Sequence, residues 1–167
     1  KGQLRLVFRV VGYGTDEFSH MKAGEEITVL GPLGNGFPLG EKEAVLIGGG
    51  IGIPPMLQLA KELPGKVTVV VGYRDADTFL MKELEEAADQ VVVATEDGSL
   101  GTKGNVIDAI REQGVKGEIL YSCGPTPMLR GVKSLGEEWG VPAWISMEEK
   151  MACGIGACLA CVCQPNQ

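Results

Sequence analysis

Three cysteines near the end of the chain are spaced as ligands of an iron–sulfur cluster. Cys153, Cys158 and Cys161 lie within nine residues, CGIGACLAC, in a C-x4-C-x2-C arrangement. This is the spacing of the first three ligands of a plant-type [2Fe–2S] cluster, whose fourth cysteine comes from further along the chain. Glycines between the cysteines allow a tight loop whose backbone N–H groups turn toward the sulfurs. The motif therefore predicts a redox-active [2Fe–2S] site.

A disulfide framework and a zinc site are the alternatives to a cluster. The sequence lacks the small, loop-rich character of a disulfide scaffold, and zinc sites more often use paired C-x2-C knuckles or Cys/His pairs. The fourth ligand stays open. Cys163 follows Cys161 by two residues and would have to be recruited in an unusual geometry; otherwise the fourth cysteine lies beyond Gln167. We expect the second case, a truncated chain in which Cys163 is a bystander.

The bulk properties favour a cytoplasmic redox protein. The 167 residues have a net charge of −7 and a hydrophobic content of 44%, which is enough for a core. They contain no Lys/Arg cluster to neutralise the phosphates of a nucleic acid or an anionic membrane. No apolar run is long enough to span a bilayer, and no signal peptide opens the chain. Free thiols then belong in a reducing compartment. Because the first residue is Lys1 rather than methionine, we also expect a cut or processed N-terminus.

Apolar patterning predicts two regions of different architecture. Residues 3–12 and 26–30 are predicted strands, with a short helix over 14–21 between them, and the glycine- and proline-rich loop 31–40 is the predicted boundary. Beyond it, valine and isoleucine runs without alternation predict strands buried on both faces of a doubly wound parallel sheet. The predicted strands of this α/β region are 44–48, 66–73, 90–95, 118–123 and 142–147, and its predicted helices are 54–63, 78–88, 104–113 and 126–139.

A glycine-rich loop follows the first strand of this predicted sheet. Gly49, Gly50 and Gly52 lie in GGGIGIPP, where glycines let the backbone approach a pyrophosphate and the next helix offers its N–H groups. A tight turn between strand and helix also needs glycine, and the spacing differs from the GxGxxG fingerprint. The loop predicts a nucleotide site that is not of the ordinary dehydrogenase type.

Two further loops follow buried strands. In SCGPTPM, at 122–128, Cys123 is either a polarizable group that lies against a flat ring or a buried structural cysteine. The polar loop at 95–104 is either a ligand contact or a solvated turn. The residues of these loops alone do not decide between the alternatives.

Four segments together resemble the ferredoxin–NADP reductase superfamily: GPLGNGF at 31–37, GGGIGIPPM at 48–56, TEDGSLGTKGNV at 95–106 and CGPTPML at 123–129. With the cysteine run added, the chain resembles over essentially its whole length the electron-transfer subunits of bacterial dihydroorotate dehydrogenase B, which carry FAD and a [2Fe–2S] cluster. The resemblance implies a ferredoxin reductase-like NAD domain at 41–147. It also implies the last part of an antiparallel β-barrel for FAD at 1–40, and the start of a truncated cluster segment at 148–167.

The resemblance also implies which residues bind the cofactors. The flavin residues are Gly14 and Thr15, at the N-terminus of the short helix, and the loop residues Gly34 and Asn35 belong to the cofactor-binding set. The nicotinamide nucleotide lies over Gly49, Gly50 and Gly52. The nicotinamide–flavin stack lies near Cys123, Gly124 and Pro125, with Cys123 as the catalytic candidate. The cluster is bound by Cys153, Cys158 and Cys161.

An electron relay is the function that the resemblance implies. NAD(H) would exchange a hydride with FAD, and single electrons would pass through the cluster to a flavin in a catalytic partner subunit that oxidises dihydroorotate in pyrimidine biosynthesis. The protein is then part of a hetero-oligomer. Since the cofactors carry the chemistry, no acid–base pair is needed, and His20 is expected to be a surface residue. Glu148 and Glu149 either lower the cluster potential or form a solvated face.

The choice of nucleotide rests on the end of the second strand of the sheet. Asp75 and Asp77 would suit ribose hydroxyls and repel a 2′-phosphate, which favours NAD over NADP, although Arg74 weakens the inference. Two other functions remain open. A reductase subunit of the same superfamily that works with ferredoxin or sulfide would use nearly the same motifs. A zinc-binding interaction module on a nucleotide-binding fold would use the cysteines without redox chemistry, and metal analysis would identify it.

Overall fold

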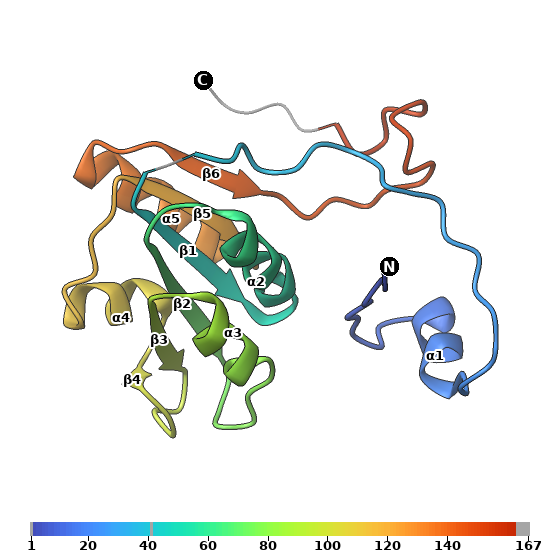
Figure 1. Ribbon diagram of the computed structural model, residues 1–167, viewed down its shortest axis with the longest axis horizontal. Helices are drawn as coiled ribbons and strands as arrows, with labels where there is room; N and C mark the ends of the chain where they lie inside the picture. The colour runs from blue at the N-terminus through green and yellow to red at the C-terminus, as the bar shows by residue number, and fades with distance from the viewer. Residues whose placement is uncertain (1, 41, 163–167) are drawn as a thin grey trace. The chain divides into compact units, whose positions relative to one another are not determined.

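A six-stranded parallel sheet forms the centre of the α/β part of the chain (Figure 1). The computed structural model describes residues 2–40 and 42–162. The strands lie in the order β4-β3-β2-β1-β5-β6, and each neighbouring pair is parallel. They are β1 (Ala44–Gly49), β2 (Val67–Tyr73), β3 (Gln90–Thr95), β4 (Thr102–Lys103), β5 (Ile119–Cys123) and β6 (Ala143–Ser146).

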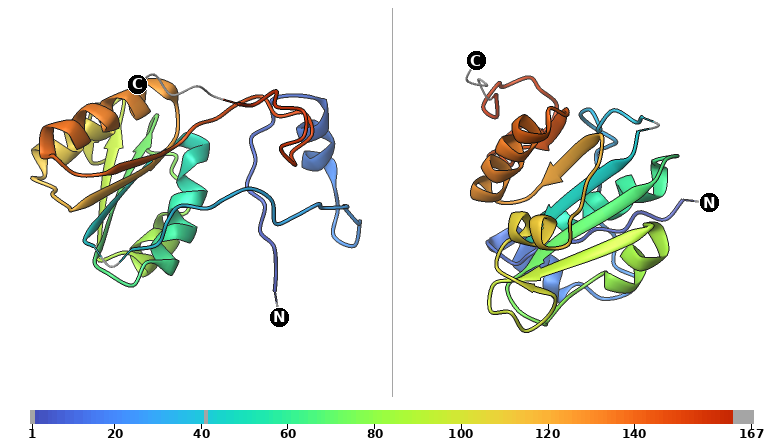
Figure 2. Two further views of the ribbon diagram at one scale, coloured as in Figure 1. Left: turned by 90° about the horizontal axis from the view of Figure 1, so that it is seen from above. Right: turned by 90° about the vertical axis from the view of Figure 1, so that its left-hand side faces the viewer.

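Helices cover both faces of this sheet (Figures 1 and 2). On one face, α2 (Ile53–Glu62) and α3 (Met81–Ala87) bury a core with side chains such as Leu46, Val69 and Tyr121. On the other face, α4 (Val106–Glu112) and α5 (Thr126–Trp139) bury a second core with side chains such as Ile47, Val70 and Leu120. Successive residues of each strand point to opposite faces, so the continuous apolar runs serve both cores.

Local sequence signals explain where several of these elements begin. All six residues of β1 are buried, as expected for a central strand of a parallel sheet. Asn105 caps α4, because its side-chain oxygen accepts the N–H groups of Ile107 at 2.8 Å and Asp108 at 3.2 Å. Prolines in the first turn of α2 and of α5 sit where a missing N–H costs little.

The doubly wound parallel sheet predicted from the sequence is confirmed, with two local differences. The α3 helix begins at Met81 rather than at residue 78, because Leu80 has a left-handed backbone with φ of 61° that a helix cannot contain. The short β4 was not predicted. It is two residues long and exists only through its pairing with Ala94 and Thr95, which no local pattern reveals.

Tyr73, at the end of β2, is expected to make the stability of this part of the protein fall as the pH becomes alkaline. The residue is 7% exposed, its hydroxyl donates to the Phe79 carbonyl at 2.6 Å, and burial raises its pKa from 10.0 to about 12. The neutral phenol therefore contributes stability that is complete below pH 10 and is lost as the pH rises toward 12.

Between pH 8 and pH 11 we expect the free energy of unfolding to fall by about 1.4 kcal/mol more in the unsubstituted protein than in Tyr73→Phe. Urea unfolding of both proteins at the two pH values measures this difference. Equal declines would show that Tyr73 titrates normally.

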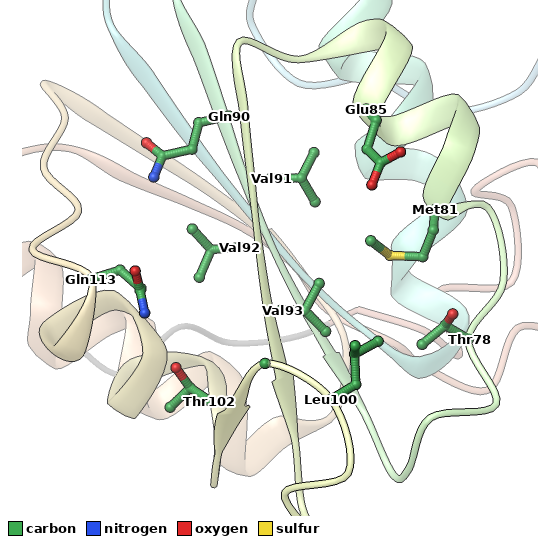
Figure 3. A pocket seen from close by; sticks show the side chains of 11 residues that line it. Thr78, Met81, Glu85, Gln90, Val91, Val92, Val93, Leu100, Thr102 and Gln113 are labelled. Carbon is green, nitrogen blue, oxygen red and sulfur yellow. The ribbon is translucent and has the colours of Figure 1, made fainter.

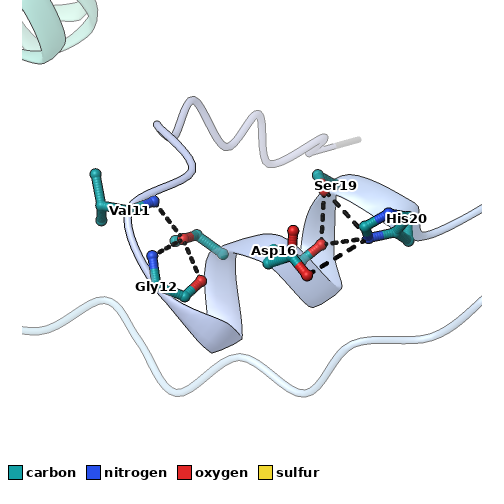
Figure 4. A network of polar contacts seen from close by, with 6 residues as sticks. Val11, Gly12, Asp16, Ser19 and His20 are labelled. Atoms are coloured by element: carbon teal, nitrogen blue, oxygen red, sulfur yellow. Dashed lines mark hydrogen bonds and ion pairs between the residues drawn. The ribbon is translucent and has the colours of Figure 1, made fainter.

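The N-terminal segment contains one helix, α1 (Tyr13–His20), and its first turn is closed by its own residues. The Thr15 hydroxyl accepts the N–H groups of Val11 at 2.9 Å and Gly12 at 3.2 Å and donates to the Gly12 carbonyl at 3.0 Å (Figure 4). At the other end, His20 is exposed, and its Nδ1–H donates to the Asp16 carbonyl at 2.8 Å. His20 is thus a surface residue, as predicted.

The strands predicted at 3–12 and 26–30 are not found among the described residues up to Gly40. Residues 3–12 are exposed, and side chains such as Leu4, Val11 and Leu30 leave more than half of their surface in water. Strands need neighbours that pair their backbone groups, and the described chain places no strand beside these two segments. The flavin barrel at 1–40 is therefore not confirmed and stays a prediction.

The chain divides into two compact units, Phe37–Glu148 and the residues up to Gly36 together with those from Glu149 onward. The first unit contains the sheet and its helices. In the second, the described cysteine segment forms bends and turns without a helix or strand. The three-domain division at 40/41 and 147/148 stays a prediction. Within the described ranges, no helix combines the length and the apolar character needed to cross a bilayer.

Candidate functional site

The centre of the sheet contains the switch point at which open α/β folds bind their ligands. β1 lies between β2 and β5, so the strand order reverses there. The chain leaves β1 toward α2 on one face and leaves β5 toward α5 on the other. Ligands bind outside the carboxyl ends of strands at such a reversal. The two loops predicted from the sequence, Gly49–Gly52 and Cys123–Pro125, are the loops that flank it.

These two loops lie in direct contact with each other. A β-carbon placed on Gly52 would overlap the carbonyl oxygen of Cys123 and would lie 2.8 Å from the nitrogen of Gly124. One placed on Gly124 would lie 3.1 Å from the nitrogen and oxygen of Gly49. Contacts below about 3.0 Å do not occur for real β-carbons. Gly52 is therefore required by the packing of one loop on the other. Gly124 lies in a tight contact with the other loop and has φ of 156°, a backbone conformation that favours glycine.

Gly49 and Gly50 differ in what surrounds them. A β-carbon on Gly49 would lie 2.8 Å from the sulfur of Met128 and 3.1 Å from Cδ of Pro125. Gly50 has nothing within 4 Å and a left-handed backbone with φ of 54°. Among the predicted glycines of the first loop, only Gly50 thus borders open space, and a ligand that approaches this loop closely would do so at Gly50.

Cys123 ends β5 on the α2 face and carries a protonated thiol at neutral pH. Burial raises the pKa of this thiol, a hydrogen bond with Ser146 of β6 lowers it, and the charge of Glu148 raises it again. A neutral, half-buried sulfur is not an activated nucleophile. Its environment suits the predicted role of a polarizable group beside a ring. Glu148, predicted to act on the cluster, acts electrostatically on Cys123.

The loops after β2 and β3 lie beside each other at the same end of the sheet. The Asp97 N–H donates to the Arg74 carbonyl at 3.4 Å, and the Asp77 N–H donates to the Asp75 carboxylate at 2.9 Å. In the 95–104 loop, the Asp97 carboxylate accepts the N–H of Ser99 at 2.9 Å and its hydroxyl at 2.6 Å, which lowers the pKa of Asp97. These side chains stabilise their own turn, which favours a solvated turn over a ligand contact.

A hollow of about 530 Å³ lies away from the switch point, beside the edge of β3 (Figure 3). Val91 and Val93 line it together with Met81 on one side of the strand, and Val92, Thr102 and Gln113 line it on the other. The hollow exists because β4 pairs only with the last two residues of β3. None of the predicted cofactor-binding residues lines it, so this gap at the sheet edge is separate from the predicted nucleotide site.

The cysteine loop surrounds Cys153 with backbone donors. The Cys158 N–H donates to the Cys153 sulfur at 3.5 Å, and this bond, with those from Ile155 and Ala157, lowers the pKa of the Cys153 thiol to about 6. Thiolate sulfur that accepts N–H groups is what iron–sulfur clusters require. The donor set thus fits a cluster, although no three potential metal ligands converge on one point within the described residues. Cys163 lies outside the described residues.

The thiols of Cys153 and Cys123 are expected to differ in their reactivity with pH. In the metal-free protein, the alkylation rate of Cys153 by iodoacetamide should reach half its maximum near pH 6, because its thiolate is stabilised. Cys123 should react only above the pKa of an ordinary thiol. Mass spectrometry of the alkylated peptides across pH 5–10 measures both profiles. Coincident profiles would contradict the N–H donation to Cys153.

The predicted flavin residues lie in the smaller unit. The hydroxyl of Thr15 is engaged by the backbone of its own helix turn, and Gly14 is exposed with open space around it. Gly34 and Asn35 lie in an exposed loop directly after Leu33, whose Cδ1 lies 3.8 Å from a β-carbon placed on Gly154 of the cysteine loop. The role of these residues in flavin binding stays a prediction.

Sequence reasoning missed two residues that contact the loops at the switch point. Met128 was quoted as part of a motif without a role, yet its side chain touches both glycine positions. Ser146 lies beside Cys123 only because β6 pairs with β5. A sequence signal for Met128 did exist: it is a long, flexible side chain in the first turn of the helix that follows CGP. No sequence signal could have placed Ser146 beside Cys123.

Comparison with protein families agrees with this geometry. The model of the oxidoreductase NAD-binding domain matches residues 46–134, just over half of the chain. The model of the iron–sulfur cluster binding domain of dihydroorotate dehydrogenase B matches residues 148–167. The first match covers the sheet from β1 to β5 with its helices, except the end of α5, and the second covers the cysteine segment.

Curated relatives carry both segments. The electron transfer subunit of dihydroorotate dehydrogenase B (NAD(+)) from Listeria monocytogenes serotype 4a is 51% identical over 166 residues, which are 95% of this chain and 64% of the relative. The subunit of the same name from a Geobacillus species is 46% identical, over 96% of this chain and 65% of the relative. The chain thus spans just under two thirds of the length of these proteins.

Solved structures place the fold among reductases. The NADH-dependent reduced ferredoxin-NADP oxidoreductase, a flavin-based electron-bifurcating protein, is 36% identical, with a TM-score of 0.80 over 92% of this chain and 58% of that one. The C-terminal domain of a Pyrococcus furiosus hydrogenase shares the fold, with a TM-score of 0.56 at 22% identity over 70% of this chain and all of that domain. With the sheet, the switch point and the family match in agreement, the chain belongs to the oxidoreductase NAD-binding domain family.

Proposed function

We propose that this chain works in the electron-transfer subunit of a dihydroorotate dehydrogenase of the B type. It relays electrons between NAD(H), FAD and a [2Fe–2S] cluster, and a catalytic flavoprotein subunit of a hetero-oligomer handles dihydroorotate. The observation that carries the proposal is the cysteine loop with its N–H-stabilised Cys153 thiolate, which follows the last strand of an NAD-binding domain. The similarity to the Listeria and Geobacillus subunits supports it over both segments.

The bound groups would supply hydride transfer and one-electron transfer, and the chain supplies their positions. Gly50 offers open backbone to the nucleotide, and the N-terminus of α2 offers N–H groups to its phosphates. Cys123 presents a neutral sulfur that neither takes nor gives a proton near pH 7. Cys153, Cys158 and Cys161 would bind the cluster as thiolates, and the donors around Cys153 favour that state.

We propose NAD as the nucleotide because of the carboxylates that follow β2, Asp75 and Asp77. Asp75 accepts the N–H of Asp77 and is thereby held in a turn, and both carboxylates would oppose a 2′-phosphate. Arg74 is the one cation in this turn that would favour the phosphate. Binding constants for NADH and NADPH, measured with the same protein, test the assignment directly. Tighter binding of NADPH would contradict it.

Electron paramagnetic resonance after addition of NADH to the anaerobically purified protein tests the relay. A rhombic signal of a reduced [2Fe–2S] cluster supports the whole path from nucleotide to iron. A signal with dithionite but none with NADH keeps the cluster and contradicts the nucleotide assignment. Zinc in the metal analysis, with no signal under either condition, would instead support a zinc-binding interaction module.

A related reductase subunit is the second candidate, because of the likeness to the ferredoxin-NADP oxidoreductase. The electron donor discriminates the two functions. Reduction of NAD⁺ by dihydroorotate in the presence of the co-purified partner supports the first proposal. Reduction by reduced ferredoxin or by sulfide, with no response to dihydroorotate, supports the second.

A further inference from the structure

Met128, in the first turn of α5, is wedged between the two loops of the nucleotide crevice. Its sulfur lies 2.8 Å from the position of a β-carbon on Gly49, and its methyl group lies 2.6 Å from that of a β-carbon on Gly124. Gly49 belongs to the end of β1, and Gly124 follows β5. One side chain therefore occupies the space that two glycines leave open in two different loops.

The packing shows that the two glycines accommodate this side chain. Gly49 has an extended backbone with φ of −133° and ψ of 129°, which any residue adopts, so its need for glycine is steric. A β-carbon there would force the flexible thioether of Met128 to shift and would crowd Cδ of Pro125. The ligand-facing position of the loop is Gly50 instead, where there is open space.

We propose that Met128 is a positioning residue for the nicotinamide nucleotide, because its thioether packs against Gly49 and Gly124 together and holds the junction of the two loops in one arrangement. This inference rests on the proposed nucleotide site between the loops. A dinucleotide must contact both loops at once, so the arrangement of their junction decides how well it binds. An unbranched thioether fills an irregular gap without strain, whereas a shorter side chain would leave a gap beside the junction of the loops.

The test measures NADH binding to the protein by fluorescence titration. Met128→Ala is expected to raise the Kd for NADH about tenfold, and Met128→Leu, of similar volume, to keep it within about twofold. ADP-ribose lacks the nicotinamide and depends less on both loops, so its Kd should rise much less in Met128→Ala. Equal losses for NADH and ADP-ribose would overturn the positioning role.

Met81→Ala is the matched control for a purely structural effect. Met81 is also a half-buried methionine in the first turn of a helix, and it lies beside Tyr73, whose hydroxyl contacts its sulfur at 3.5 Å. Its truncation should lower the Tm as Met128→Ala does but leave the Kd for NADH within about twofold. An equal loss of NADH affinity in Met81→Ala would show that general loosening explains the effect.

A double-mutant cycle tests the wedge itself. Gly49→Ala places a β-carbon against the Met128 sulfur and is expected to weaken NADH binding about tenfold. In the Met128→Ala background the same change should cost less than about threefold, because the obstructing atoms are gone. Independent effects that multiply would overturn the inference. If the unsubstituted chain does not bind NADH, the proposed nucleotide site fails first and the inference with it.

Discussion

Replacing Gly52 with alanine is expected to separate the Gly49–Gly52 and Cys123–Pro125 loops at the switch point and to lower the stability of the NAD-binding part by about 3 kcal/mol or more. Gly52 has φ of −78°, which suits any residue, so the cost is not conformational. The new β-carbon would overlap the Cys123 carbonyl and approach the Gly124 nitrogen, which are backbone atoms that cannot rotate away. Urea unfolding measures the loss, and the same protein should no longer bind NADH.

Gly50→Ala is expected to cost little stability but to weaken NADH binding strongly. The substitution meets no atom within 4 Å, and its cost to stability is the left-handed backbone strain of about 1–2 kcal/mol. Its methyl group would enter the open space at the ligand-facing loop, so the Kd for NADH should rise by about tenfold or more.

Gly114→Ala is the matched control for Gly50→Ala. Gly114 has φ of 63° with open space around it, and it lies at the end of α4, away from the crevice. It should lose comparable stability and keep its affinity for NADH. If Gly50→Ala and Gly114→Ala bind NADH equally well, the face of the loop at Gly50 is not the nucleotide face.

Serine at Cys153, Cys158 or Cys161 is expected to lower the iron and sulfide content of the anaerobically reconstituted protein by about tenfold or more and to abolish its visible absorption. Serine does not supply the thiolate that iron requires, and in Cys153→Ser the N–H groups around this position would face a neutral hydroxyl in place of the thiolate. Iron and sulfide analysis, with the absorption spectrum, measures the effect.

Cys123→Ser serves as the control, since Cys123 ends β5 and belongs to the unit that contains the sheet. Its iron content should equal that of the unsubstituted protein, and retention of the cluster in Cys158→Ser would refute the ligand assignment. Cys163→Ser decides the open question of the fourth ligand. Loss of the cluster would assign Cys163 as a ligand, and retention would leave it a bystander.

The α/β architecture followed from the sequence because its signals are local. Valine and isoleucine runs identify strands that are buried on both faces, and Asn105 marks a helix start through its own side chain. Elements such as α5, predicted at 126–139, agree with the structure at both ends. Alternation of strand and helix then leaves a parallel sheet as the arrangement that buries both faces.

The strands predicted at 3–12 and 26–30 failed for a reason that lies outside local pattern. Alternating apolar residues such as Leu4, Leu6 and Phe8 show a preference for a strand, but a strand forms only where another strand pairs with it. The same limit applies to β4, which exists only through its two pairs with β3.

The functional residues divide in the same way. The amino-acid sequence by itself determined the motifs from which the functional residues are predicted: the cysteine spacing, the glycine loop and the CGP loop are all visible in consecutive letters. Only the tertiary structure decided which glycines are packed and which is open. Gly49, Gly52 and Gly124 lie against atoms of the opposing loop, which is more than seventy positions away in the chain, whereas Gly50 borders open space. Steric contact between loops that are distant in the chain depends on the sheet order, and no local pattern encodes it.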